Sequence, residues 1–396
     1  MLLCDAASGG DESEVARLLQ LGAFVDERNS EDATPLICAA RSGSWSCVQL
    51  LLSHGADVNA EDKSARTAWM YSVIEGHDES LRALLEHGVD LRATQHFSWI
   101  NQINEQRIGA GTCLRLLAAH GFDVNARSPG GWSYLHEAAY YSKERFVSVL
   151  LELGADANAQ CNRGFTALMS AIASEDYCPF IVLLLIQHGA QVNAADERGM
   201  TALLYAAAEI NNHCVGILLR HGACVLSKAH DGSNALHKVL GYMWYPMPTL
   251  LDECRLGIMH LLVRHGVLVN GQDVYGRAPL DVWSTSFLLA LHDNQYGTIS
   301  CWGWKHVFEL LVQCGADINR GAEVECGTAT ALMYLMMVLG TKLPVLLEQK
   351  DDLYYNALQK AAEIESTLVL NLGRLSLAHI RRLLLEDLNE WLSEED

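Results

Sequence analysis

Apolar residues recur in short blocks along the chain, and each block ends in a glycine. The segments QLLLSHG (49–55) and RALLEHG (82–88) place leucines at helical spacing and polar residues around them. A glycine directly after the last apolar residue is the commonest residue where a helix ends in a left-handed conformation. The pattern therefore predicts a series of amphipathic helices, each terminated by glycine.

These closing glycines are periodic, and their period predicts the architecture. Five of them follow one another at intervals of 33 residues, and the series continues at intervals of 35, 33, 44 and 49. They are Gly22, Gly55, Gly88, Gly121, Gly154, Gly189, Gly222, Gly266 and Gly315. We number repeats one to nine by these glycines. A fixed period of this length indicates a stack of identical helical units, and the longer steps indicate insertions.

A second marker begins 12 residues after a closing glycine, in segments such as TPLICAA (34–40), TALMSAI (166–172) and TALLYAA (201–207). Thr34 suits a helix N-cap and Pro35 its first turn, while Ala39 and Ala40 keep the helix thin enough for close packing. These segments resemble the Thr-Pro-Leu-His-x-Ala signature of ankyrin repeats, whose period is also 33 residues. The resemblance covers residues 1 to about 340.

The resemblance implies an all-α solenoid of stacked helix pairs with short β-hairpin fingers and a C-terminal helical cap. It also implies that two recurring residue types are structural. Histidines precede the closing glycines, where a partial positive charge is favourable near a helix C-terminus; they are His54, His87, His120, His188, His221 and His265. Asparagines that stabilise the hairpin in similar proteins, and can be hydroxylated there, recur as Asn59, Asn125, Asn158, Asn193 and Asn319.

Several segments depart from the pattern. The first repeat begins at Met1, already inside a helix, so we expect this end to be a cap or a truncation. Repeat four (99–121) keeps the period but lacks the second marker. Repeats eight and nine carry extra residues near 242–253 and 292–304. We expect one solenoid over residues 1–340 and a helical extension over 341–396, whose acidic end caps the stack.

Composition narrows the partners and the compartment. The formal net charge of −20 disfavours binding to nucleic acid, because the phosphate backbone would be repelled. Twelve cysteines are scattered without a close pair, which is typical of reduced core thiols rather than disulfides or zinc ligands. No basic leader or bilayer-length apolar window stands out. We expect a monomer in the cytoplasm or the nucleus, without membrane insertion.

The sequence lacks the common motifs of catalytic and metal-binding sites. No phosphate-binding glycine loop, nucleophile elbow, kinase set or zinc-protease string occurs in a strand-to-helix setting. His292, Cys301 and His306 lie close together in the chain, but their spacing matches no common metal site. We therefore expect no enzymatic activity, no cofactor and no metal.

Large side chains gather instead where similar repeats bind proteins, at the hairpin tips and on the groove-facing side of the first helices. The residue before the helix cap is large and apolar in four consecutive repeats, and tyrosines and glutamates lie near it on the helices. Aromatic residues dominate binding hot spots, and glutamates favour a partner with basic side chains. The expected partner-binding residues are Trp99, Trp132, Phe165, Met200, Tyr71, Tyr140, Tyr141, Tyr205, Tyr242, Glu75 and Glu209.

These features predict a protein-interaction scaffold that binds a protein or peptide through its concave groove and hairpin tips. The alternative is a substrate-recognition adaptor of a cullin-type ubiquitin ligase. The tail segment SLAHIRRLLLEDLNEWL (376–392) resembles a shortened SOCS box, but Arg381 replaces the expected cysteine and the proline-containing cullin-contact stretch is missing. Leu377, Ile380 and Leu384 also form one helical stripe, as a cap requires.

Overall fold

The computed structural model describes residues 2–91, 98–103, 109–174, 176–241, 250–283, 307 and 310–317. The chain divides into two compact units, Met1–Glu197 and Arg198–Asp396. The expected insertion around 292–304, the His292/Cys301/His306 grouping, Tyr242 and the whole tail from 318 onward lie outside the described residues. Each of the two units is built from helices.

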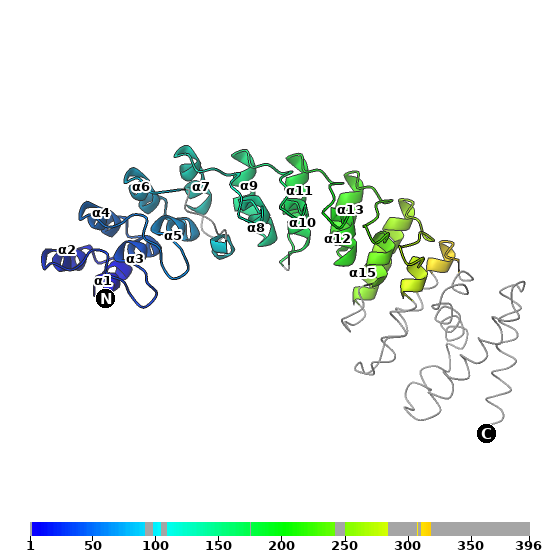
Figure 1. The fold of residues 1–396 in the computed structure, drawn as a ribbon, viewed down its shortest axis with the longest axis horizontal. Coiled ribbons are helices and arrows are strands. Elements are labelled where there is room, and N and C mark those ends of the chain that lie inside the picture. The colour runs from blue at the N-terminus through cyan, green and yellow to red at the C-terminus, as the bar shows by residue number, and fades with distance from the viewer. Residues whose placement is uncertain are drawn as a thin grey trace, which may run out of the picture. The chain divides into compact units, whose positions relative to one another are not determined.

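The first unit is a stack of antiparallel helix pairs, and Figure 1 shows their two rows within this unit. One row holds the first helix of each pair: α1 (Leu2–Gly9), α3 (Pro35–Ser42), α5 (Ala68–Glu75), α8 (Tyr134–Tyr140) and α10 (Ala167–Ile172). The other row holds the second helices: α2 (Glu12–Gln20), α4 (Trp45–Ser53), α6 (Asp78–Glu86), α7 (Gly109–Ala119), α9 (Glu144–Glu152) and α11 (Pro179–Gln187).

The second unit repeats the same pairing. Its first helices are α12 (Ala202–Ala208) and α14 (Ala235–Gly241), and its second helices are α13 (Asn212–Arg220) and α15 (Leu250–Arg264). In the described part of the chain, bridge pairing is limited to two isolated bridges, Arg127–Ser133 and Gln160–Thr166, at two hairpin bases. The all-α repeat fold predicted from the periodicity is thereby confirmed.

The signals read from the sequence act as expected. The Thr34 hydroxyl accepts a hydrogen bond from the Ile37 backbone N–H at 3.4 Å and so caps α3. Gly55 closes α4 with a φ of 81°, in the left-handed region. His54 lies with its Nδ1 2.9 Å from the Leu50 carbonyl oxygen, and His87, His120 and His188 make the same contact one turn back. These histidines therefore stabilise helix ends.

Asparagines join several of the repeats to the next one. The Asn125 side chain accepts from the Asp156 N–H at 2.8 Å and donates to the Gly154 carbonyl at 3.2 Å. Asn158 makes the equivalent pair with Gln191 and Gly189. In the second unit Asn270, which the sequence reading did not single out, bridges to Asp317 and Gly315. The predicted hairpin role of these side chains thus extends across a repeat boundary.

Repeat four is the exception within the first unit. Its described first segment is a 3₁₀ helix, η1 (Ser98–Gln102). Trp99 fills the space: it is 1 % exposed and lies edge-on to Trp69 and Phe146, with ring centroids 5.8 and 6.1 Å away. Tyr134 approaches the same indole at 6.2 Å. Trp99 is thus part of an aromatic core shared by repeats three, four and five.

A close backbone contact also supports this joint. Gly109, at the start of α7, lies so near Gly76 that a Cβ added there would come within 1.9 Å of the Gly76 carbonyl oxygen. Only glycine permits that approach.

Candidate functional site

The partner site expected from the sequence is only partly assembled on the surface. Trp99 was expected at a hairpin tip, but its burial in the aromatic core removes it from any accessible surface. The count from one repeat marker to the next assumes a regular hairpin and helix, and repeat four has a 3₁₀ helix instead. The assignment of Trp99 to a binding ridge is therefore corrected to a core role.

Tyr71 is also buried, and its hydroxyl contacts a residue of its own hairpin. Its side chain is 8 % exposed, and its hydroxyl donates to an Asp62 carboxylate oxygen 2.6 Å away. The guanidinium groups of Arg41 and Arg66 lie 5.7 and 5.9 Å from the ring centre, within cation–π range. Burial and the Asp62 contact raise the pKa of this phenol. Little of Tyr71 remains for a partner.

Tyr205 and Met200, in the second unit, are each 8 % exposed. The Tyr205 hydroxyl lies 2.6 Å from Nη2 of Arg198, whose guanidinium carbon is 5.9 Å from the ring centre. Glu209 is exposed at the end of α12, and Glu75 is half-buried at the end of α5. The remaining expected residues that the structure describes lie in repeats five and six of the first unit.

Four of the expected residues do come together there. Trp132 and Phe165, from consecutive hairpin tips, stack with ring centroids 6.0 Å apart and an interplanar angle of 28°. Tyr140 lies edge-on to Trp132 at 6.3 Å and to Tyr141 at 5.1 Å. All four side chains are half-buried, so each offers a face to solvent. We call this patch of Trp132, Tyr140, Tyr141 and Phe165 the aromatic surface.

The fold holds the two hairpin tips of the aromatic surface in place. His136, in α8, is fully buried, and its Nε2 lies 2.9 Å from the carbonyl oxygen of Phe165 in the next repeat. Its Nδ1 accepts from the Ser133 backbone N–H at 3.2 Å, so the proton resides on Nε2 and is donated to Phe165. Burial lowers the pKa of His136, which keeps the ring neutral.

The neighbouring tip is fixed by a glycine. Gly131 has a φ of 79°, and a Cβ built there would come within 2.4 Å of Oδ1 of Asn162 in the next hairpin. Asn162 in turn donates two hydrogen bonds to the neighbouring turn: its backbone N–H donates to the Gly130 carbonyl oxygen at 3.0 Å, and its Nδ2 donates to the Pro129 carbonyl oxygen at 2.9 Å. Trp132 is therefore presented from a rigid turn.

Glu137 is the residue of this site that the sequence reading missed. It lies in α8 one helical turn before Tyr140 and Tyr141, which places the three side chains on one helix face. Its side chain is half-buried, and burial raises the pKa of the carboxyl group. Comparing the fourth residue after each cap would have found it, because that position carries large or charged side chains in several repeats.

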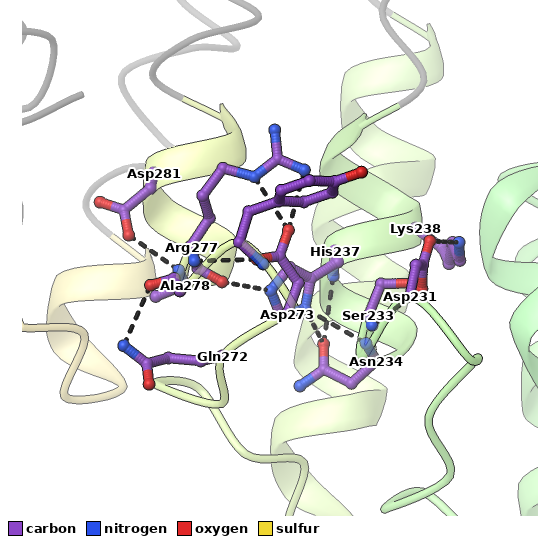
Figure 2. Close-up of polar contacts among 12 residues, drawn as sticks. Asp231, Ser233, Asn234, His237, Lys238, Gln272, Asp273, Arg277, Ala278 and Asp281 are labelled. Carbon is purple, nitrogen blue, oxygen red and sulfur yellow. Dashed lines mark hydrogen bonds and ion pairs between the residues drawn. The ribbon is translucent and has the colours of Figure 1, made fainter. Parts of the chain in front are cut away.

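The same positions look different in the second unit, as Figure 2 shows. Here the Lys238 ammonium pairs with Asp231 at 3.1 Å, and the Ser233 hydroxyl also contacts that carboxylate. Arg277 pairs with Asp273 at 2.8 Å, and its guanidinium lies 4.9 Å from the ring centre of the exposed Tyr275. This surface is polar, and its charges are matched internally.

The part of the chain that the structure describes holds neither a metal-ligand cluster nor a membrane-spanning helix. Among the described residues no group of three or more histidine, cysteine or acidic side chains could hold a metal ion. Within the same residues no helix has the length and apolar character needed to span a membrane. The aromatic surface offers contact area and hydrogen-bonding groups, which are features of protein-binding sites.

Comparisons with known proteins agree with this architecture. A family model described as "Ankyrin repeats (3 copies)" matches residues 3–95 and 106–196, and one described as "Ankyrin repeat" matches residues 198–230, together more than half of the chain. Among solved structures, the human ASB11 ankyrin repeat domain is similar at 23 % identity and a TM-score of 0.49, covering 57 % of this chain and 99 % of that one. No curated protein matches the sequence.

Proposed function

The chain belongs to the ankyrin-repeat family, and we propose that it is a scaffold that holds a partner protein or peptide against the aromatic surface. Ankyrin repeats generally mediate protein–protein interactions, and proteins built from them are typically interaction scaffolds rather than enzymes. The observation that carries the proposal is the Trp132–Phe165 stack with Tyr140 and Tyr141, four half-exposed rings on rigid supports. Rigid aromatic side chains give large contact area at small entropic cost.

The proposal has a direct test in affinity purification of the full chain. Trp132→Ala should release partners that the wild type retains, with a loss of affinity of about 30-fold for an aromatic hot spot. Trp45→Ala is the matched control, because Trp45 is 47 % exposed but lies on α4, in the row of second helices. Partners that survive Trp132→Ala and disappear with Trp45→Ala would refute the choice of surface.

The adaptor alternative depends on residues 376–392, which lie outside the described residues, so it stays a prediction from the sequence. The same purification tests it when the whole chain is compared with a chain ending near residue 340. Elongins or a cullin recovered only with the whole chain, and lost on Leu377→Asp, would favour the adaptor. We also propose the cytoplasm or nucleus as the compartment, because the twelve cysteines are spread singly.

A further inference from the structure

The fourth residue after the helix cap is polar in several repeats, and in three of them it reaches a partner in its own hairpin. Tyr71 donates to Asp62, five residues before its cap. In the second unit Tyr205 contacts Arg198, and Lys238 pairs with Asp231, each three residues before the cap. In these three repeats the side chain at this position thus points toward the hairpin and finds its polar partner there.

Glu137 occupies this position in repeat five and has no such partner. In the other repeats the partner lies five or three residues before the cap, and in repeat five these positions are Ser128 and Gly130. The Ser128 hydroxyl oxygen accepts from the Trp132 N–H at 3.2 Å, and Gly130 has no side chain. Among the described residues its carboxylate makes no hydrogen bond or ion pair, and burial alone raises its pKa. An ionised group left half-buried and unpaired is costly.

Basic residues of the neighbourhood are engaged elsewhere. Arg127, in the same hairpin, donates to the Gln160 carbonyl at 2.7 Å. Lys143, at the start of α9, donates to the Ile103 carbonyl at 2.8 Å. Within the described residues Arg127 forms no ion pair with Glu137. The hairpin of repeat five therefore supplies no charge that would balance Glu137.

The rings beside Glu137 point to the same missing group. Tyr71 has Arg41 and Arg66 within cation–π range, and Tyr205 has Arg198. Over the part of the chain that the structure describes, no such cation is found at Trp132, Tyr140 or Tyr141, although indole faces attract cations more strongly than phenol faces. This patch therefore combines exposed π-faces with an unbalanced carboxylate.

We propose that Glu137, Trp132 and Tyr140 form a subsite for a basic side chain, lysine or arginine, carried by the bound partner segment. The cation pairs with the Glu137 carboxylate and lies against the two rings, while Phe165 and Tyr141 contact apolar neighbours in the segment. The inference rests on the proposed function, since it specifies what the aromatic surface recognises. It makes Glu137 a specificity residue that the other repeats described here do not duplicate.

The test selects short unstructured peptides from a displayed random library against the full chain. Wild-type protein should enrich peptides with one fixed lysine or arginine next to apolar residues. Glu137→Gln should weaken a selected peptide about tenfold, the scale of one charge-assisted hydrogen bond. Replacing the basic residue of that peptide by norleucine should cost a similar factor, and the two changes together should cost little more than either one.

Two controls separate loss of charge from loss of fold. Glu86→Gln removes an exposed glutamate from the end of α6, in the row of second helices, and should leave peptide binding unchanged. Glu137→Lys should reject the basic peptide and recover binding when the peptide's basic residue is changed to glutamate. That recovery requires a folded protein, so it excludes unfolding as the cause.

Each outcome decides between this subsite and the proposed function. Selected peptides that need Trp132 but show no fixed basic residue would overturn the cation subsite and leave the aromatic surface standing. Peptides that bind Trp132→Ala as tightly as the wild type would overturn both, and so would a library that yields no binder. A basic peptide that tolerates Glu137→Gln without loss would also end the assignment of Glu137.

Discussion

Repeats five and eight position a buried histidine in the same way, but their surfaces differ in chemical character. His136 reaches the Phe165 carbonyl and His237 the Arg277 carbonyl, each at 2.9 Å and each at the residue before the next cap. In repeat five the surrounding surface is aromatic, and its glutamate, Glu137, has no ion pair among the described residues. In repeat eight it is an internally neutralised network of charges (Figure 2).

The difference shows which positions build the fold and which ones vary for function. Histidine and asparagine side chains that cross repeat boundaries recur in both units and bond to backbone atoms, so they are indifferent to neighbouring side chains. The residue before the cap and the fourth residue after it change freely, from Trp132 and Glu137 to Ser233 and Lys238. The same backbone thus supports either a surface whose charges are paired within the chain or a surface that offers an unpaired charge to a partner.

The largest expected effect comes from Trp99, which belongs to neither surface. Trp99→Ala should lower the free energy of unfolding by about 3–5 kcal/mol, because it empties a fully buried site among Trp69, Tyr134 and Phe146. Urea denaturation followed by circular dichroism measures the loss. A stable variant that fails only in partner binding would return Trp99 to the binding ridge.

The shared histidines should have equal and smaller effects. His136→Phe and His237→Phe should each cost about 1–3 kcal/mol, since each leaves a carbonyl of the next repeat without its donor. A large difference between the two costs would contradict the equivalence of the repeats.

Both histidines also predict a pH dependence. Burial lowers both imidazole pKa values below the usual 6.5, so the unfolded chain binds protons first as pH falls. Wild-type stability should therefore decrease as pH drops from about 6.5 through the folded pKa. The double variant should show a flatter profile over that range in thermal unfolding.

Replacing the two carboxylates near the caps, Asp231 and Glu137, should change the free energy of unfolding in opposite directions. Asp231→Asn should cost about 0.5–1 kcal/mol at neutral pH, a modest value because this side chain is half exposed. Burial opposes its ionisation, but hydrogen bonds from Ser233 and Lys238 prevail and lower its pKa to about 2. This contribution is present above pH 3.8 and should fade as pH falls toward 2, which acid titration of the two proteins measures.

The smallest effect is expected at Glu137, and it is a gain. Glu137→Gln should raise the free energy of unfolding at neutral pH by up to about 0.5 kcal/mol, because it removes an unpaired half-buried charge. The raised pKa means that wild-type stability falls as pH rises from 4.5 through the folded pKa, and the variant should not follow. A loss of stability in Glu137→Gln would indicate an internal partner for this carboxylate.

The repeat fold could be predicted from the sequence because its signals are local. Gly55, Thr34 and His54 each act within one helical turn, so spacing alone identifies them. The role of Trp99 could not be predicted by counting, because the count assumes that Trp99 lies at a hairpin tip, and it lies instead within the 3₁₀ helix η1. Its burial depends on three side chains from repeats three and five, which only the folded stack brings together.

The candidate site could be predicted from the sequence only in part. Counting back from the cap identified Trp132 and Phe165 as neighbours, and they stack. Tyr71 and Tyr205 were expected to face a partner from the first helices, but both are buried, with Arg41 and Arg198 within cation–π range of their rings. Glu137 escaped notice because a glutamate on a helix is ordinarily solvated, and only the lack of a hairpin partner distinguishes it.

The asparagine bridges carry a consequence for how the protein is made. Asn125 and Asn158 each find both of their partners about thirty residues later in the chain, at Asp156 and Gly154 and at Gln191 and Gly189. While the ribosome is still adding residues, the newest repeat therefore lacks its onward bridges until the following one has emerged. During synthesis the folded part of the chain always ends in an incomplete repeat, so nascent-chain chaperones meet one exposed boundary that moves along the sequence as translation proceeds.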